Sequence, residues 1–499
     1  MNDLFHARQF LLGPRPDPRL SSWQRLDLRH GLVLQTHPNL ECMQRQRGDR
    51  SLTLIGFALT LEKPAQRHPE MLDALLEGAG SLEALLAASD GLSGRWILIL
   101  EDAQRSVLFQ DATGLRTAVH TLPANPETWV ASQPALIAHA LGLQPDPQAL
   151  DFWEASGAKI PKHIRAWPGA ATAFAALHAL LPNHYLDLRT REVVRFFPRE
   201  HLEPISLADG TRLISEHLRD SVAAAHARYQ VLQQVTAGLD SRAILAASRG
   251  HRLQTGYFTC IWPTLEPGMT EEHRDVAVPR DLLGSLGLPH KVYSCPNRPL
   301  EAGFAEAFAT CDSPPLAELG PAIQPLLEPI PPTAMVLNGN GGEIGRCRLH
   351  PNGHPPTVAL PALCNLHWPG MGQHPFVQTH LAPWLSEAGA AADRTGYRLL
   401  DLFYWEQKMS RRVARGFLHL DMAHETFSPY NSRALLRLYL AVPEQHRRPA
   451  EGHVLQHAVI RELWPAALDR EINPATVSDR GARLWRRLRR RARGLGLPV

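Results

Sequence analysis

The segment Val231–Ala247, with the sequence VLQQVTAGLDSRAILAA, constrains the fold of this chain more than any other. Its apolar start predicts a buried strand, Gly238 marks a turn, and the alanine-rich continuation predicts a helix that begins near Asp240 or Ser241. A turn before a helix directs free backbone N–H groups and the positive end of the helix dipole at one point. The segment therefore predicts an anion-binding loop between a strand and a helix.

The side chains of this loop suit a phosphate bound with a metal ion. Gly238 lacks a Cβ, so a phosphate can approach the backbone closely. The hydroxyls of Thr236 and Ser241 can donate to phosphate oxygens, whereas Asp240 would repel a phosphate unless Mg²⁺ lay between them. The alternative is that Asp240 and Ser241 only cap the helix, since both residue types are favoured there.

Strands and helices alternate around the loop. A helix is predicted over Leu207–Gln230 and another around Arg274–Leu286, and strands are predicted over Leu253–Ile261, His290–Tyr293 and Ala334–Leu337. Such alternation favours a parallel sheet covered by helices on both faces. The pattern is nearly all helical from Thr395 onward.

The first two hundred residues have a different character. Short apolar or alternating runs predict strands over Ser51–Glu62, Arg95–Glu101, Ser106–Gln110, Trp129–Ser132 and Arg191–Phe197. Helices are predicted over Met71–Ala88 and Gln133–Leu143. A chain of 499 residues is too long for one core, so we expect domains over 1–204 and 205–475, followed by a basic tail over 476–499.

Two glycine-containing motifs resemble signatures of the asparagine synthetase family, which includes β-lactam synthetases and lasso-peptide cyclases. Gly238, Asp240 and Ser241 match its SGGxDS pyrophosphate loop, and Thr236 and Ala237 replace the usual serine and glycine. The segment Leu337–Arg346, LNGNGGEIGR, resembles its GxGxDE signature. The resemblance implies that ATP and Mg²⁺ are bound, with Asp240 and Glu343 as metal ligands and Asp240, Ser241 and Glu343 as catalytic residues. It implies these nucleotide-binding residues: Thr236, Ala237, Gly238, Leu239, Asp240, Ser241, Thr259, Asn338 and Gly339.

Later segments extend the resemblance and depart from it at one position. Asp275, with Leu286–His290 after it, resembles the family's D…L-G-x-x-H stretch, and Met422–Tyr430 resembles its M-A-x-x-x-E…P-F-L-D segment. The family's late lysine has no counterpart here, because no lysine follows Lys408. Arg470 or Arg480 can supply positive charge in its place.

The amino-terminal region is similar to class II glutamine amidotransferase domains. Leu92–Trp96 and Asp111–Arg116 resemble the F-D-G-x-F…D-x-x-G-x-R pattern. That chemistry needs a cysteine at the mature N-terminus, whereas the first cysteine here is Cys42. We therefore expect an amidotransferase-like β-sandwich without glutaminase activity, followed by a pyrophosphate-loop α/β domain with a parallel sheet and a helical carboxyl-terminal part.

The resemblance implies an ATP-dependent ligase that forms amide bonds. A carboxylate on a small molecule, a saccharide or a peptide would be activated as an acyl-adenylate, and an amine would then attack it. Ring closure within one substrate, as in β-lactam or lasso-peptide formation, is an alternative. A nucleotide-binding pseudoenzyme that acts as a scaffold is another, and a nucleic-acid-modifying enzyme is a third that only the basic tail suggests.

Net charge and cysteine usage indicate the partners and the cellular compartment of the protein. A net charge of +3 argues against nucleic-acid binding over the whole surface, so no nucleic-acid partner is expected. The tail Arg480–Arg493 is either a solvated terminus or a contact for an acidic partner or membrane surface. Six scattered cysteines without a C-x-x-C pair favour reduced thiols over a disulfide framework or a zinc site. Together with the absence of a secretion signal, this predicts a cytoplasmic protein.

Overall fold

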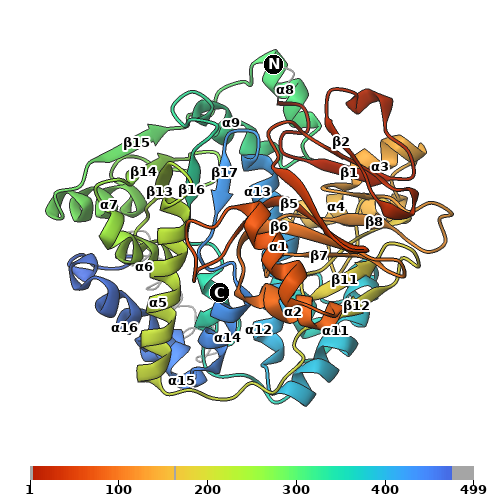
Figure 1. The fold of residues 1–499 in the computed structure, drawn as a ribbon. Coiled ribbons are helices and arrows are strands. Elements are labelled where there is room, and N and C mark those ends of the chain that lie inside the picture. Colours follow the sequence, from red (N-terminus) through yellow and green to blue (C-terminus); the bar gives the residue numbers. More distant parts are fainter. Residues whose placement is uncertain (1–3, 162–163, 475–499) are drawn as a thin grey trace, which may run out of the picture.

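A computed structural model describes residues 4–161 and 164–474 and contains three sheets (Figure 1). Two are antiparallel and come from the amino-terminal part, and one is parallel and comes from the carboxyl-terminal part. The predicted mixture of antiparallel and parallel α/β structure is thereby confirmed. The Arg-rich tail predicted from the sequence lies outside the described residues.

The two antiparallel sheets pack against each other as a sandwich. The first has the order β10-β8-β9-β1-β3-β2 and the second the order β12-β11-β7-β6-β5-β4. Phe10, Leu34, Ile55 and Ile97 are among the apolar side chains of the core that they share. The strands are β1 (Phe10–Gly13), β2 (Gln24–Asp27), β3 (Val33–Thr36), β4 (Cys42–Arg47), β5 (Arg50–Leu59), β6 (Ser93–Glu101), β7 (Ser106–Gln110), β8 (Val119–Thr121), β9 (Val130–Ala131), β10 (Leu177–Ala179), β11 (His184–Asp187) and β12 (Val193–Arg195).

Helices cover the outer faces of this sandwich. The single helix predicted over Met71–Ala88 is two helices, α1 (His68–Gly78) and α2 (Leu82–Ala88), which pack on the second sheet. The prediction was wrong because Ser81 caps a new helix by accepting a hydrogen bond from the Ala84 N–H. The first sheet is covered by α3 (Pro134–Leu141) and α4 (Pro147–Gly157) together with carboxyl-terminal helices.

The carboxyl-terminal part has a five-stranded sheet in the order β15-β14-β13-β16-β17, and every pair in it is parallel. Its strands are β13 (Val231–Gln234), β14 (Gly256–Ile261), β15 (His290–Ser294), β16 (Met335–Leu337) and β17 (Glu425–Phe427). The last was missed by the sequence prediction, which expected a nearly all-helical pattern in this region. Three residues carry too short a pattern to predict a strand, and only the pairing with β16 defines it.

Helices cover both faces of the parallel sheet, as predicted. One face packs on α5 (Leu207–His226), α6 (Leu239–Ala247), α7 (Arg274–Ser285) and α16 (Val454–Leu463). The other packs on α8 (Ala302–Ala309) and α9 (Gly320–Ile323). The chain runs outward from β13 to β15, crosses back through α8 and α9, and enters β16 on the other side of β13. The connections therefore leave in opposite directions from β13 and β16, where open α/β sheets place their ligand crevice.

The other α-helices and one π-helix come after β16 in the chain. They are α10 (Leu360–His367), α11 (Pro375–Thr395), α12 (Leu399–Phe403), the π-helix η10 (Tyr404–Val413), α13 (Ala414–Leu420), α14 (Arg433–Ala441) and α15 (Glu444–Arg447). Side chains of α10, α11 and η10 share one core with the first antiparallel sheet.

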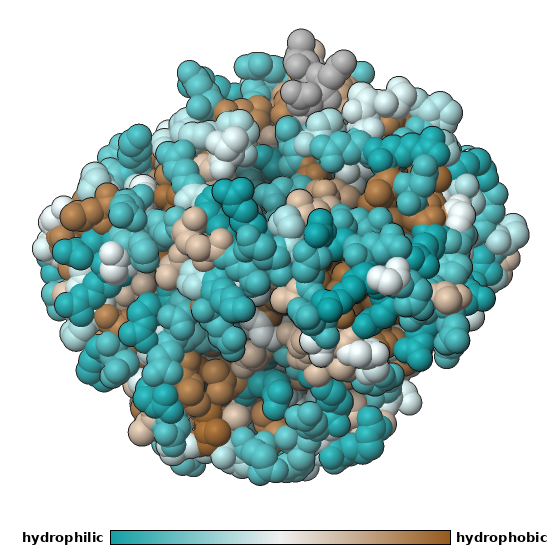
Figure 2. Space-filling view, viewed as in Figure 1, coloured by the Kyte–Doolittle hydropathy of each residue, from teal (hydrophilic) through white to brown (hydrophobic). Residues whose placement is uncertain are grey.

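The surface is mostly hydrophilic in the view of Figure 2, with hydrophobic residues scattered over it. Among the described residues, the exposed large hydrophobic side chains are Leu150, Val193, Leu253 and Val454. No helix in the described part of the chain is long and apolar enough to cross a membrane.

Candidate functional site

The predicted anion-binding loop lies at the carboxyl end of β13, where α6 begins with Gly238 as its N-cap. The Ser241 hydroxyl is the centre of the loop: it accepts from the Thr236 N–H at 3.2 Å and lies 2.9 Å from the Thr236 hydroxyl. The Ala237 N–H donates to Asp275 Oδ1 at 2.9 Å, so Asp275 also shapes the loop. The expected strand, turn and helix are confirmed, and both hydroxyls are turned toward each other.

The second predicted motif follows β16, which pairs directly with β13. A Cβ added to Gly339 would lie 2.7 Å from the Ser241 N, and one added to Gly342 would lie 2.5 Å from Asp240 Oδ1. The Gly339 clash is with backbone, so that position needs glycine, whereas a Cβ at Gly342 would displace the Asp240 carboxylate. Asn338 lies just before them, and its side-chain oxygen accepts from the Asn340 N–H at 3.2 Å. Two loops about a hundred residues apart in sequence are thus packed against each other.

Asp240 and Glu343 share one guanidinium. Arg346 forms an ion pair with Asp240, and its Nη2 lies 4.0 Å from Glu343 Oε1. Burial, against the opposing charge of Arg346 and together with the neighbouring charge of Glu343, raises the pKa of Asp240 to about 7. Asp240 Oδ1 is buried without a hydrogen-bond partner among the described residues. The two predicted metal ligands therefore lie together, with one carboxylate oxygen available.

Several cations and a tyrosine of this site were missed by the sequence analysis. Tyr404 begins the π-helix η10, and burial together with the adjacent Glu343 carboxylate raises the pKa of its hydroxyl. Lys408 lies one turn later, with Nζ 5.7 Å from the Tyr404 ring centre. Burial and the charges of Arg412 and Arg348 lower the pKa of Lys408 to about 8, and Glu343 opposes that shift. No motif predicts this placement, because it depends on how η10 packs.

Two other expectations about single residues have a structural outcome. Thr259 lies in β14 with an exposed fraction of 1%, and its hydroxyl donates to the Val235 carbonyl at 2.6 Å. That hydroxyl therefore holds two strands together. Arg470 is exposed, and its guanidinium donates to the carbonyl of Asp469. Arg480 lies outside the described residues.

The carboxyl-terminal end of the described chain packs beside the loop. The Arg242 guanidinium donates to the Glu471 carbonyl at 2.9 Å and to the Ala467 carbonyl at 3.3 Å. The Asn473 N–H donates to the Ala237 carbonyl at 3.1 Å. Residues 467–473 thereby form one wall of the site.

A buried ion cluster joins the two parts of the chain. Arg95 donates to both oxygens of Asp421, at 2.5 and 2.7 Å, and to Glu425 at 2.8 Å. Arg116 donates to both oxygens of Glu425, at 2.9 and 2.8 Å. Arg116 and Glu425 both belong to predicted motifs, and the structure uses them for contact between the parts.

The turn Asp111–Arg116 is held by hydrogen bonds from two sides. Asp111 accepts from the backbone N–H groups of Thr113, Leu115 and Arg116. Asn431 from the carboxyl-terminal part accepts from the Thr113 N–H at 2.9 Å and donates to Asp111 Oδ1 at 2.9 Å. The amidotransferase-like motif therefore forms part of the contact between the two halves.

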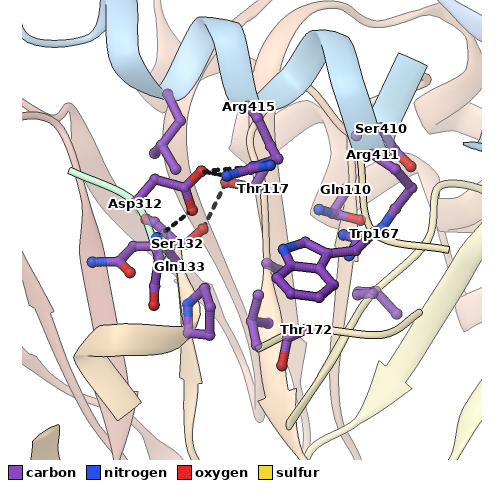
Figure 3. Close-up of a pocket in the computed structure, with 17 residues that line it drawn as sticks. Gln110, Thr117, Ser132, Gln133, Trp167, Thr172, Asp312, Ser410, Arg411 and Arg415 are labelled. Atoms are coloured by element: carbon purple, nitrogen blue, oxygen red, sulfur yellow. Dashed lines mark hydrogen bonds and ion pairs between the residues drawn. The ribbon is translucent and has the colours of Figure 1, made fainter. Parts of the chain in front are cut away.

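A cavity lies where η10 and α13 meet the first antiparallel sheet (Figure 3). Asp312 and Arg415 form an ion pair at 2.6 Å on its wall, and Trp167 faces it from the amino-terminal part. Its volume of about 30 Å³ has room for water and excludes a nucleotide.

Comparison with known proteins adds little to this geometry. No family model matches the chain, and no curated protein matches it. Among solved structures, glutamine phosphoribosylpyrophosphate amidotransferase from B. subtilis, complexed with ADP and GMP, aligns at 10% identity and a TM-score of 0.24, covering 61% of this chain and 66% of that one. A structure titled as the allosteric regulatory enzyme of purine biosynthesis aligns at 12% identity and a TM-score of 0.24, covering 47% and 56%. This chain spans less than two thirds of either, and similarity this weak supports no conclusion about activity.

Proposed function

We propose that this protein is an ATP-dependent amide-bond-forming ligase that activates a carboxylate as an acyl-adenylate. The observation that carries the proposal is the convergence of Asp240 and Glu343 from loops at the ends of two adjacent parallel strands. Backbone N–H groups at the start of α6 suit the anionic phosphates of a nucleotide.

The acidic residues fit a magnesium ion. Asp240 Oδ1 has no partner among the described residues, and the Glu343 side chain is 28% exposed. Carboxylate oxygens are the ligands that Mg²⁺ prefers, and it binds ATP phosphates through them. When bound, it would neutralise charge that builds on pyrophosphate as it leaves. Asp240 and Glu343 would hold it, and Gly339 and Gly342 keep the space between the loops narrow.

The reaction balances without a redox partner. A substrate carboxylate oxygen attacks the α-phosphorus of ATP, and the bond to pyrophosphate breaks. An amine nitrogen then attacks the acyl carbon, the bond to AMP breaks, and the nitrogen loses a proton. Lys408 and Arg346 would offset negative charge on the phosphates. Exclusion of water would protect the adenylate from hydrolysis.

The amine donor in this proposal is a substrate amine or free ammonia. Cys42, the first cysteine, lies at the start of β4, and burial raises the pKa of its thiol to about 12. A thiol of that pKa is not a nucleophile at neutral pH. Attack by an amine of the same substrate, which closes a ring, is a second form of the proposed chemistry.

A nucleotide-binding scaffold without turnover is the second candidate function. The ion pair between Arg346 and Asp240 favours it, because the guanidinium already neutralises a proposed metal ligand. Competition between Arg346 and a metal ion would then limit catalysis.

Pyrophosphate release from Mg-ATP tests these candidates. The purified protein is incubated with a pool of carboxylates and amines, beside Asp240→Ala and a control, Asp151→Ala, whose side chain is exposed on α4. Release of pyrophosphate and AMP that Asp240→Ala abolishes supports the ligase. Binding of Mg-ATP without release, across pools that include peptides and amino sugars, supports the scaffold. Failure to bind Mg-ATP refutes both.

A further inference from the structure

Cys347, His350 and Glu444 form a cluster next to the candidate site. Cys347 directly follows the 3-10 helix η9 (Gly342–Arg346), which carries Glu343, and Glu444 begins α15. The sulfur of Cys347, a ring nitrogen of His350 and a carboxylate oxygen of Glu444 all lie within 4.8 Å of one another. Cys347 and His350 are only three positions apart in the sequence, although the cysteines as a set favour reduced thiols over a zinc site.

From this geometry we propose that Cys347, His350 and Glu444 bind a zinc-type divalent cation. The proposal is independent of the proposed ligase function. A tetrahedral zinc ion separates its sulfur and nitrogen ligands by about 3.5 Å, given its usual bond lengths. His350 Nδ1 and Glu444 Oε1 are 3.3 Å apart, so small shifts would place all three ligands around one ion. Thiolate with imidazole selects zinc over magnesium or calcium.

The surroundings of His350 are those of a metal ligand. Its Nε2 lies 2.9 Å from Asp401 Oδ1, and Asp401 accepts from Arg447 at 3.0 Å through its other oxygen. Asp401, His350 and Arg447 are all buried. A carboxylate on one imidazole nitrogen fixes the ring and leaves the other nitrogen for a metal. That other nitrogen is Nδ1, which faces Glu444.

The competing interpretation is an ion pair without metal. A protonated His350 would bridge Asp401 and Glu444, and Arg398 Nε lies 3.7 Å from Glu444 Oε2. That interpretation explains the histidine and both acids. It gives no role to the Cys347 thiol, which is fully buried and lies 4.0 Å from the Glu444 backbone carbonyl.

Charge balance also favours the cation. A divalent ion with one thiolate, one carboxylate and one neutral imidazole is neutral overall, and Asp401 keeps Arg447 as its partner. Binding would release the thiol proton of Cys347 and any proton on His350 Nδ1. His354 is the candidate for a fourth ligand, because its Nδ1 is buried without a hydrogen-bond partner among the described residues. Its ring lies edge-on to that of His350 at 5.3 Å.

A bound ion would hold the backbone beside the candidate site. Cys347 has a left-handed conformation with φ of 49°, which is unfavourable for a residue other than glycine. Coordination of its sulfur would offset that cost and fix the end of η9. The loop that carries Glu343 and Arg346 would then be attached to α15. We therefore assign the cluster a structural role.

Cobalt binding to the full-length, untagged protein tests the proposal. After removal of metals with a chelator, Co²⁺ is titrated in, and one equivalent is expected to give thiolate-to-cobalt charge-transfer absorption that Zn²⁺ abolishes. Cys347→Ser should lose that band, and Asp401→Asn should weaken binding about 10–100-fold. Cys364→Ser is the control, because Cys364 is also buried but lies on α10, outside the cluster. His354→Ala reports whether a fourth ligand is protein or water.

Either of two results would overturn the proposal: the wild type shows no charge-transfer band, or Cys347→Ser shows an unchanged band. Where a variant fails to fold by circular dichroism, the unmodified protein is treated with a thiol reagent, and labelled cysteines are identified by mass spectrometry. Zn²⁺ should slow labelling of Cys347 at least tenfold and leave Cys364 unaffected. Equal labelling with and without Zn²⁺ would refute the site.

Discussion

The buried ion cluster between the two parts predicts that removing one charged side chain from it lowers the free energy of unfolding substantially. Arg95→Met keeps a similar side-chain volume but removes three hydrogen bonds to Asp421 and Glu425, of 2.5, 2.7 and 2.8 Å. Asp421 is fully buried, and only the longer 3.5 Å contact from Arg116 would then offset its charge within this pair of arginines. Breaking a buried pair by removing one partner costs about 3–5 kcal/mol, so the free energy of unfolding should fall by that amount.

Urea unfolding followed by tryptophan fluorescence measures this cost. The control is Arg45→Met, because Arg45 pairs with Asp73 at 2.9 Å with both side chains about half exposed. That variant should unfold at the wild-type midpoint, since exposed pairs contribute little. The double variant Arg95→Met/Asp421→Leu should recover much of the loss, because both buried charges are then absent. An Arg95→Met midpoint equal to that of Arg45→Met would refute the reasoning.

Three further predictions concern the site and the π-helix. Gly342→Ala should weaken Mg-ATP binding at least tenfold in a nucleotide titration, since its Cβ would lie 2.5 Å from Asp240 Oδ1, whereas Gly389→Ala, with nothing within 4 Å, should bind normally. In the proposed reaction, Lys408→Ala should slow pyrophosphate release on the order of 10²-fold with a smaller change in KM, because its charge would act on the leaving group. Burial favours the neutral form of Glu406, but the charge of Arg195 outweighs the effect of burial and lowers the carboxyl pKa below its usual 4.5. The free energy of unfolding should therefore decrease as the pH falls from 4.5 through this lowered pKa. Glu406→Gln should flatten this acid loss in melting temperatures measured from pH 6 to pH 3.

Local patterns were enough to predict the elements that position the site. The strand β13, the turn at Gly238 and the helix α6 form a continuous signal of apolar residues, glycine and alanine. The second loop was predicted in the same way, because an apolar strand ends in glycines. Alternation of strands and helices also indicated the parallel sheet with both faces covered. These features depend on neighbours in sequence, which is why sequence alone reveals them.

Features that depend on distant pairing were missed. The charge of Glu343 acts on Lys408 and Tyr404 only because η10 packs beside the loop, and nothing in their spacing indicates it. Glu444 lies 94 positions from His350, so their cluster could not be read from sequence as a set of three ligands. The pair Cys347 and His350 was visible, but a single cysteine three positions before a histidine is a weak signal.

The amino-terminal part contributes to the site without contacting the proposed phosphates. Asp111 and Thr113 form hydrogen bonds with Asn431. The neighbouring Tyr430 has its hydroxyl 3.4 Å from the Asp240 carbonyl. The contacts that connect the turn Asp111–Arg116 to the loop carrying Asp240 are therefore few and buried. Without the amino-terminal part, Asn431 and the carboxylate of Asp421 would lose the hydrogen bonds that Thr113 and Arg95 donate to them. A protein that takes its amine from a substrate would still need the amino-terminal part, because that part positions the segment that contacts Asp240.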